Sequence, residues 1–253
     1  MTELSMNRYA EALRDQTAQF VALARDADLD QRVPSCPEWD LRRLVEHVGQ
    51  AHRFAASHVE RRVTALHEVG PFEPMTGTVA DWLVGGAERL VAAVTESGPD
   101  AEVWNFTGVD QRARFWLRRM VHETAVHRAD VALTVAAPYR LDADVAADAI
   151  SEWLSLVTSP GAAARRPDLV GEMTGTGQTL HLHATDTPGE WLIERGPEAV
   201  TWTHGHRKAD VAARGTAADL LLMVFGRIPV HDDRIELFGE VGLFEHWVEH
   251  MTF

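Results

Sequence analysis

The spacing of the apolar residues changes its period at about residue 159, and this change restricts the possible fold more than any other feature of the sequence. Before that point, four segments carry apolar residues in steps of three, four and seven, with breaks or loops between them: about 1–27, 40–63, 79–94 and 111–135. This spacing is typical of amphipathic helices. Four such helices predict a bundle, and residues 142–158 predict one more helix.

The loop SPGAAARRPD (159–168) follows, and after it the apolar residues alternate. TLHLHATD (179–186) has the period of a strand, and further strands are expected at 191–193, 200–203 and 209–213. Thr216, with Asp219 three residues later, resembles a capping box that opens a helix, and IELFGE and VGLFEHWVEHM predict a last strand and helix. We therefore predict an α+β fold, with a helical bundle at residues 1–158 and a smaller α+β domain at 170–253.

Composition excludes several classes of partner. The formal net charge of -14, with 24 basic against 38 acidic residues, argues against nucleic acid, because phosphate binding needs clustered Lys and Arg. No apolar stretch approaches the ~20 residues needed to cross a bilayer, so we expect a cytoplasmic protein without a membrane partner. Cys36 is the single cysteine, beside 13 histidines, so any bound metal needs nitrogen and carboxylate ligands.

The stretch RRMVHETAVHRAD (118–130) on the fourth expected helix is the first candidate for such a site. Glu123 and His127 lie four residues apart and share a helix face, at about 40° from each other. His122 and His127 diverge by roughly 140°, which excludes the zinc-protease arrangement. A Glu-x-x-x-His pair on a helix is also compatible with a solvated contact that contributes a few tenths of a kcal/mol.

A catalytic zinc usually has three protein ligands, so a third ligand must come from another helix. The segment 40–63 offers three histidines, and periodicity does not choose among them: His47, His52 and His58. In the expected strand at 179–186, His181 and His183 alternate on one face, but polar residues on the open face of a sheet need no function.

Five stretches together resemble the family of mycothiol-dependent maleylpyruvate isomerase-like enzymes, whose N-terminal bundle is of the DinB type. They are CPEWDLRRLVEHVGQAHRF (36–54), GPDAEVWNF (98–106), FWLRRMVHETAVHRAD (115–130), LHLHATDTPGEW (180–191) and RGTAADLLLMVFGR (214–227). They occur in the family's order and cover most of both expected domains. Each stretch alone is a weak signal, and the set is specific.

The resemblance implies a set of site residues. The family's metal ligands correspond to His47, Glu123 and His127, with zinc as the expected ion for two imidazoles and a carboxylate. Asp130, three residues after His127, is placed to orient that imidazole or to make a surface contact. Arg227 matches an arginine that would hold a carboxylate of the substrate or of the thiol, although a cation at a helix C-terminus is also favoured by the helix dipole alone.

The function implied by the resemblance is that of a zinc-dependent enzyme that activates a low-molecular-weight thiol, mycothiol, as the thiolate. Its partners would be this cosubstrate and a small electrophilic substrate. Addition of the sulfur to a cis double bond permits rotation, and elimination then returns the trans product and the thiol; in a transferase the adduct is the product. Two alternatives stay open: a metal-dependent hydrolase or biosynthetic cyclising enzyme that uses no thiol, and a non-catalytic ligand-binding protein on the same scaffold.

Overall fold

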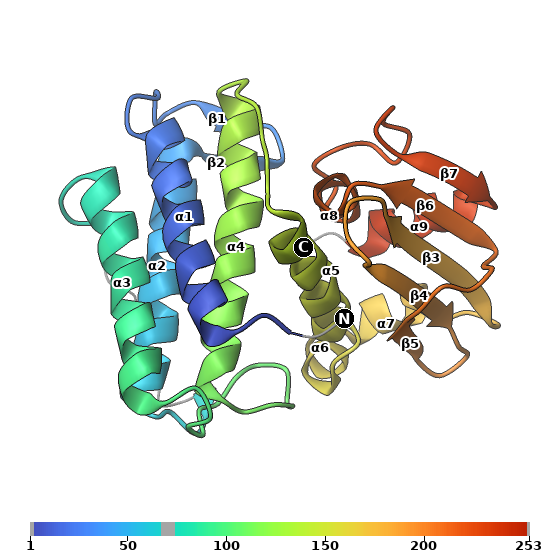
Figure 1. Cartoon of the computed structure of the whole chain (residues 1–253), viewed down its shortest axis with the longest axis horizontal. Coiled ribbons are helices and arrows are strands. Elements are labelled where there is room, and N and C mark those ends of the chain that lie inside the picture. The colour runs from blue at the N-terminus through green and yellow to red at the C-terminus, as the bar shows by residue number, and fades with distance from the viewer. Residues whose placement is uncertain (1–2, 67–73, 252–253) are drawn as a thin grey trace. The chain divides into compact units, whose positions relative to one another are not determined.

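The computed structural model describes residues 3–66 and 74–251 and divides the chain into two compact units, Leu4–Tyr139 and Arg140–Phe253 with Met1–Glu3 (Figure 1). The first unit contains the helical bundle and the second contains a mixed sheet with helices, so the predicted α+β class is confirmed. Among the described residues, no helix is both long enough and apolar enough to cross a bilayer.

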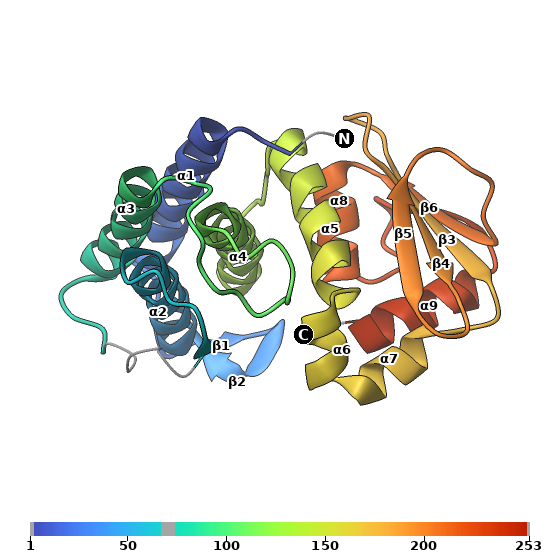
Figure 2. The ribbon, with the colours of Figure 1, turned by 90° about the horizontal axis from the view of Figure 1, so that it is seen from below.

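Four long helices form the bundle: α1 (Met6–Ala24), α2 (Leu41–Glu60), α3 (Val79–Ser97) and α4 (Ala113–Thr134). Asp40 caps α2 as expected, because its side chain accepts a hydrogen bond of 2.8 Å from the backbone N–H of Arg43. Thr78 and Asp81 form a capping box at the start of α3, and Gly98, with φ of 82°, ends it. In Figure 2, which looks nearly along these helices, α4 lies beside both α1 and α2.

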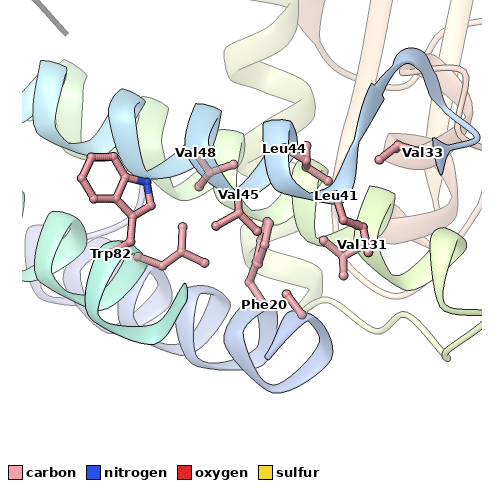
Figure 3. Packing of buried hydrophobic residues seen from close by; sticks show 10 residues of the cluster. Phe20, Val33, Leu41, Leu44, Val45, Val48, Trp82 and Val131 are labelled. Atoms are coloured by element: carbon pink, nitrogen blue, oxygen red, sulfur yellow. The ribbon is translucent and has the colours of Figure 1, made fainter. Parts of the chain in front are cut away.

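The core of this unit is an apolar cluster that joins α2 to its neighbours (Figure 3). Leu44, Val45 and Val48 of α2 pack with Phe20 of α1 and Trp82 of α3, and all five side chains are almost fully buried.

The approach of α2 to α3 is closest at Gly49. A Cβ atom built there would lie 2.0 Å from Nε1 of Trp82, so this position requires glycine. The contact fixes the position of α2, and with it the position of His47 two residues earlier.

A short antiparallel pair of strands, β1 (Arg32–Val33) and β2 (Cys36–Asp40), connects α1 to α2. The apolar spacing does not predict this pair, and Pro34 and Pro37 favour a loop between the first two helices. Prolines are tolerated in such a two-stranded edge, where one side of each strand needs no ladder hydrogen bond. The pair places residues 35–39 next to α4, where Ser35 contacts Asp130.

The second unit has a five-stranded sheet in the order β5-β4-β3-β6-β7. Its strands are β3 (Gln178–Ala184), β4 (Glu190–Arg195), β5 (Val200–His204), β6 (Val211–Gly215) and β7 (Glu236–Gly239). β3 and β6 are parallel, and the other neighbours are antiparallel. Helices α8 (Ala217–Val224) and α5 (Ala143–Val157) lie on one side of the sheet (Figure 2), and α9 (Val241–Met251) ends the fold. Thr216 caps α8, as the sequence predicts.

Helix α5 belongs to the sheet unit, so the division at Tyr139–Arg140 lies before the predicted boundary at residues 158–170. Trp191 of β4 donates a hydrogen bond of 2.8 Å from its indole N–H to the Ser151 hydroxyl, and the Trp153 ring lies 5.9 Å from that of Phe225. The apolar period of residues 142–158 predicts a helix correctly but carries no information about its packing partner.

The segment expected to be a loop contains two short helices, α6 (Pro160–Arg165) and α7 (Pro167–Met173). Each starts at a proline, a residue that is favoured at the first helical position because its missing N–H would have no helical partner there. The prolines of SPGAAARRPD therefore mark helix starts as well as the end of α5.

Candidate metal centre

Two neighbouring helices bring together the three residues that the sequence analysis predicts as metal ligands. His47 lies on α2, and Glu123 and His127 lie one turn apart on α4. Nε2 of His47 lies 3.0 Å from Oε1 of Glu123, and Nε2 of His127 lies 3.2 Å from the same oxygen. One ligand atom from each residue lies within 4.8 Å of the others.

These separations suit a single ion. Zinc binds imidazole nitrogen at about 2.0–2.1 Å in tetrahedral geometry, which puts neighbouring ligand atoms about 3.3 Å apart. The two measured contacts, 3.0 and 3.2 Å, are close to that value. Two imidazoles and a carboxylate are also a donor set that zinc favours, and they leave a fourth position open.

The other histidines of this unit that the sequence analysis considered lie elsewhere. His52 is fully buried, with Nε2 2.8 Å from the hydroxyl of Thr124, and His58 Nδ1 lies 2.7 Å from the carbonyl oxygen of Phe54. His122 is buried, and its ring meets the Tyr9 ring edge-on, with 6.3 Å between centroids. Of the three histidines of α2 left open by periodicity, His47 is the one beside the Glu-x-x-x-His pair.

Asp130 fixes the orientation of His127. Nδ1–H of His127 donates to Oδ2 of Asp130 at 2.7 Å, and the Ser35 hydroxyl donates to Oδ1 of the same carboxylate at 2.5 Å. In the neutral imidazole, a proton held on Nδ1 leaves the Nε2 lone pair on the side of Glu123 and His47, so binding of a cation there requires loss of the Nε2 proton. Asp130 is fully inaccessible to solvent, so its contact with His127 is a buried hydrogen bond and not a surface contact.

The charges around the cluster favour a cation. Burial alone would raise the pKa of the Glu123 carboxyl, but the Arg119 guanidinium and the two imidazoles hold that pKa well below its usual range. Burial disfavours the charged form of His127, yet its bonds to Asp130 and Glu123 outweigh this effect and raise the pKa of the imidazole to about 9. The carboxylates of Glu123 and Asp130 thus place two negative charges beside the imidazoles, against the one positive charge of Arg119.

Two neighbours of the cluster were not predicted. The Trp39 ring of β2 lies 4.8 Å from the His47 ring and 6.1 Å from that of His127, whereas the sequence analysis gave it no role at the site. Arg119 contacts Oε2 of Glu123, its i+4 neighbour on α4. The spacing of Arg119 and Glu123 is a signal that the sequence carries; the approach of Trp39 depends on the unpredicted β1–β2 pair.

The cluster is partly open on the side of α2. The His47 side chain is 34% exposed, whereas those of Glu123 and His127 are 18% and 10% exposed. The ligands on α4 are therefore more shielded from solvent than His47.

Arg227 lies in the sheet unit, just after α8. Gly226, with φ of 69°, reverses the chain there, and Arg227 Nη1 donates to the carbonyl oxygen of Phe225 at 2.7 Å. The guanidinium is half-buried. That Arg227 binds a carboxylate of the substrate or of the thiol stays a prediction.

Two sequence models of one protein family match the chain. The mycothiol maleylpyruvate isomerase N-terminal domain matches residues 10–132, and the MDMPI C-terminal domain matches residues 144–246. Together the two matches span most of the bundle and most of the sheet unit. No curated protein is similar enough to the chain to count as a match.

Two solved structures have a similar fold. The crystal structure of mycothiol-dependent maleylpyruvate isomerase is 15% identical, with a TM-score of 0.55, over 95% of this chain and 97% of that chain. A histidine-to-alanine mutant of a mycothiol-dependent maleylpyruvate isomerase is 14% identical over the same shares, with a TM-score of 0.57. At this identity the likeness shows the fold and nothing finer.

Proposed function

This chain belongs to the mycothiol maleylpyruvate isomerase family, and we propose that it is a zinc-dependent enzyme that uses mycothiol to isomerise a small unsaturated substrate. The observation that carries the proposal is the convergence of His47, Glu123 and His127, whose ligand atoms lie within 4.8 Å of one another. The names of the similar structures supply the thiol and the reaction class.

Each residue of the cluster has a distinct part in this proposal. His47, Glu123 and His127 hold the ion, and a bound zinc supplies a site at which a thiol loses its proton near neutral pH. Asp130 keeps the proton of His127 on Nδ1, so that Nε2 is the ligand atom. Arg119 offsets the charge of Glu123, so a divalent ion held by these residues would keep a net positive charge, which favours an anionic thiolate.

Arg227 is the residue that we propose for the carboxylate of the substrate or of the thiol. A guanidinium binds a carboxylate with two parallel N–H bonds, which a lysine ammonium does not reproduce. We expect Arg227→Lys to lower kcat/KM by about 10- to 100-fold, because a hydrogen bond to a charged group contributes about 1.5–3 kcal/mol. Steady-state kinetics with varied substrate and varied thiol would show which of the two the arginine holds; equal kinetics for wild type and variant would remove the role.

Metal analysis of purified wild type, His47→Ala and Glu123→Ala tests the centre. We expect each variant to bind one zinc fewer per chain than wild type. His231→Gln is a matched control, because His231 is exposed and lies 2.7 Å from Glu245 at a different place in the fold. Full zinc content in either bundle variant would contradict the ligand assignment.

Cobalt substitution tests the thiol. Mycothiol added to the cobalt protein should produce a sulfur-to-cobalt charge-transfer band, and maleylpyruvate should isomerise only when thiol is present. An unchanged spectrum together with thiol-independent turnover would favour the metal enzyme without thiol. Thiol found covalently in the product would favour the transferase, and ligand binding without turnover would favour the non-catalytic protein.

A further inference from the structure

We propose that the sheet unit binds a second metal ion, a structural one, through His181, His183, Glu190 and His206. This site is independent of the bundle cluster and of the proposed function. One ligand atom from each of these four residues lies within 4.8 Å of the others. The carboxylate of Glu190 is at the centre: its oxygens lie 2.8 Å from His206 Nδ1, 3.1 Å from His183 Nδ1 and 3.4 Å from His181 Nε2.

The pairing of the strands builds this cluster. His181 and His183 alternate on β3, so both side chains project from one face, while Leu180 and Leu182 are buried on the other. Glu190 is the first residue of β4 and pairs directly with His183 in the antiparallel register. His206 follows the end of β5 by two residues, and the backbone N–H of Gly205 bonds to the Glu190 carbonyl at 3.2 Å, which holds that turn beside the cluster.

The separations around Glu190 suit a tetrahedral donor set. Ligand atoms around a tetrahedral zinc lie about 3.3 Å apart, and the three contacts of Glu190 range from 2.8 to 3.4 Å. The three imidazole rings meet nearly edge-on, with centroids 5.3–6.0 Å apart. The rings therefore do not stack on one another, and one ligand atom of each lies within 4.8 Å of the others.

A buried nitrogen supplies a second, separate observation. The His181 side chain is 5% exposed, and within the described residues its Nε2 has no partner in hydrogen-bond geometry; the nearest Glu190 oxygen lies 3.4 Å away. A buried polar atom without a partner costs about 1–3 kcal/mol, so native structures rarely keep one. A metal ion at the centre of the cluster would bind this lone pair.

The number of protein ligands indicates whether the proposed ion is structural or catalytic. Four protein ligands complete a tetrahedral shell, as in structural zinc sites, whereas catalytic zinc sites keep a position open. The ion would join β3, β4 and the turn after β5. Imidazole and carboxylate donors suit a divalent first-row transition ion, and we choose zinc as the test ion.

Zinc titration of untagged, chelator-treated full-length protein tests the site. Glu123→Ala removes the bundle centre, so that the sheet cluster can be measured alone. In this background we expect one zinc per chain by native mass spectrometry, and His206→Asn should weaken its binding by at least about 100-fold, beyond the effect of losing a residue that only orients a ligand. His206 is 73% exposed, so the substitution should not disturb folding.

His231→Gln in the same background is the control. His231 is exposed, lies 2.7 Å from Glu245 and belongs to no metal-like cluster of the described residues, so this substitution should leave the zinc content unchanged. Cobalt absorption gives a second readout: an intense tetrahedral spectrum is expected, and His206→Asn should abolish it. Absence of zinc binding in the Glu123→Ala background, or unchanged zinc content and cobalt spectrum in the His206→Asn variant, would overturn the proposal. If the bundle centre itself does not exist, the His206→Asn comparison still decides this site.

Discussion

The bundle and the sheet each gather histidines around one glutamate, but they do so with different numbers of ligands and different support. In the bundle, two imidazoles and Glu123 converge, and the carboxylate of Asp130 accepts a hydrogen bond of 2.7 Å from Nδ1 of one imidazole, that of His127. In the sheet, three imidazoles surround Glu190 and complete a fourfold set. Three oriented ligands leave a position for chemistry, whereas four ligands close the shell. Under the two proposals, the bundle cluster would be a reactive centre and the sheet cluster would hold strands together.

The two clusters also depend on different parts of the fold. The bundle cluster needs α2 and α4 at the correct distance, and this distance is set by side-chain packing such as that at Gly49. The sheet cluster needs the register of β3 and β4, which is set by backbone hydrogen bonds. Perturbations of helix packing should therefore affect zinc binding in the bundle and spare the sheet.

Acidification should cause the largest expected loss of bundle stability. His52 is fully buried between α2 and α4, and burial lowers its pKa from 6.5 to about 4. Because the folded-state pKa is the lower one, this contribution to bundle stability is complete above pH 6.5 and is lost as the pH falls toward 4. The loss amounts to about 3 kcal/mol.

Urea unfolding of metal-free protein at pH 7 and at pH 4, followed by a bundle-specific probe, measures this loss. His52→Gln keeps a polar side chain opposite Thr124 without titrating, so its stability should change less over the same range. An equal acid sensitivity in the two proteins would show that His52 is not the responsible group.

Overpacking between α2 and α3 should give the next largest loss of stability. Gly49→Ala places a Cβ 2.0 Å from Trp82 Nε1, and overpacking of this kind destabilises by about 1–3 kcal/mol. Thermal unfolding should show the loss, and zinc titration should show weaker binding in the bundle with unchanged binding in the sheet. Gly85→Ala is a matched control on α3, where the nearest atom to the added Cβ is an arginine nitrogen at 3.5 Å, an ordinary van der Waals distance. Equal stability of Gly49→Ala and wild type would show that the helices can move apart freely.

Loss of the carboxylate behind His127 should lower the zinc affinity of the bundle centre. Asp130→Asn keeps the shape of the side chain but weakens its control of the imidazole, and such residues change metal affinity by about 10- to 100-fold. Competition with a coloured chelator would measure the zinc affinity, with Asp110→Asn as an exposed control. An affinity within twofold of wild type would mean that Asp130 has only a packing role.

Much of the fold follows from local patterns in the sequence. The helix starts at Asp40 and Thr216 carry their own capping residues, and the alternation of residues 179–186 indicates β3 directly. The pairing of Glu123 with His127 follows from helix geometry alone. The choice of His47 over His52 and His58 did not follow from periodicity, and only the family resemblance supplied it.

What the sequence did not predict depends on contacts between distant segments. The β1–β2 pair brings Ser35 and Trp39 to α4, and nothing near Pro34 and Pro37 indicates that contact. In the sheet, the alternation of His181 and His183 is visible, but Glu190 joins them through the hairpin register and His206 through a turn. A histidine pair followed by a carboxylate seven residues later, across a Thr-Pro-Gly turn, is the signal that could have found this cluster.

Anomalous diffraction at the zinc edge tests the central claim most directly. Crystals of the zinc-loaded protein should show a peak about 2.0–2.2 Å from His47 Nε2, Glu123 and His127 Nε2, with a fourth position filled by solvent or thiol. A zinc-loaded crystal with no peak among these three side chains, or a peak that involves only one of them, would contradict the account.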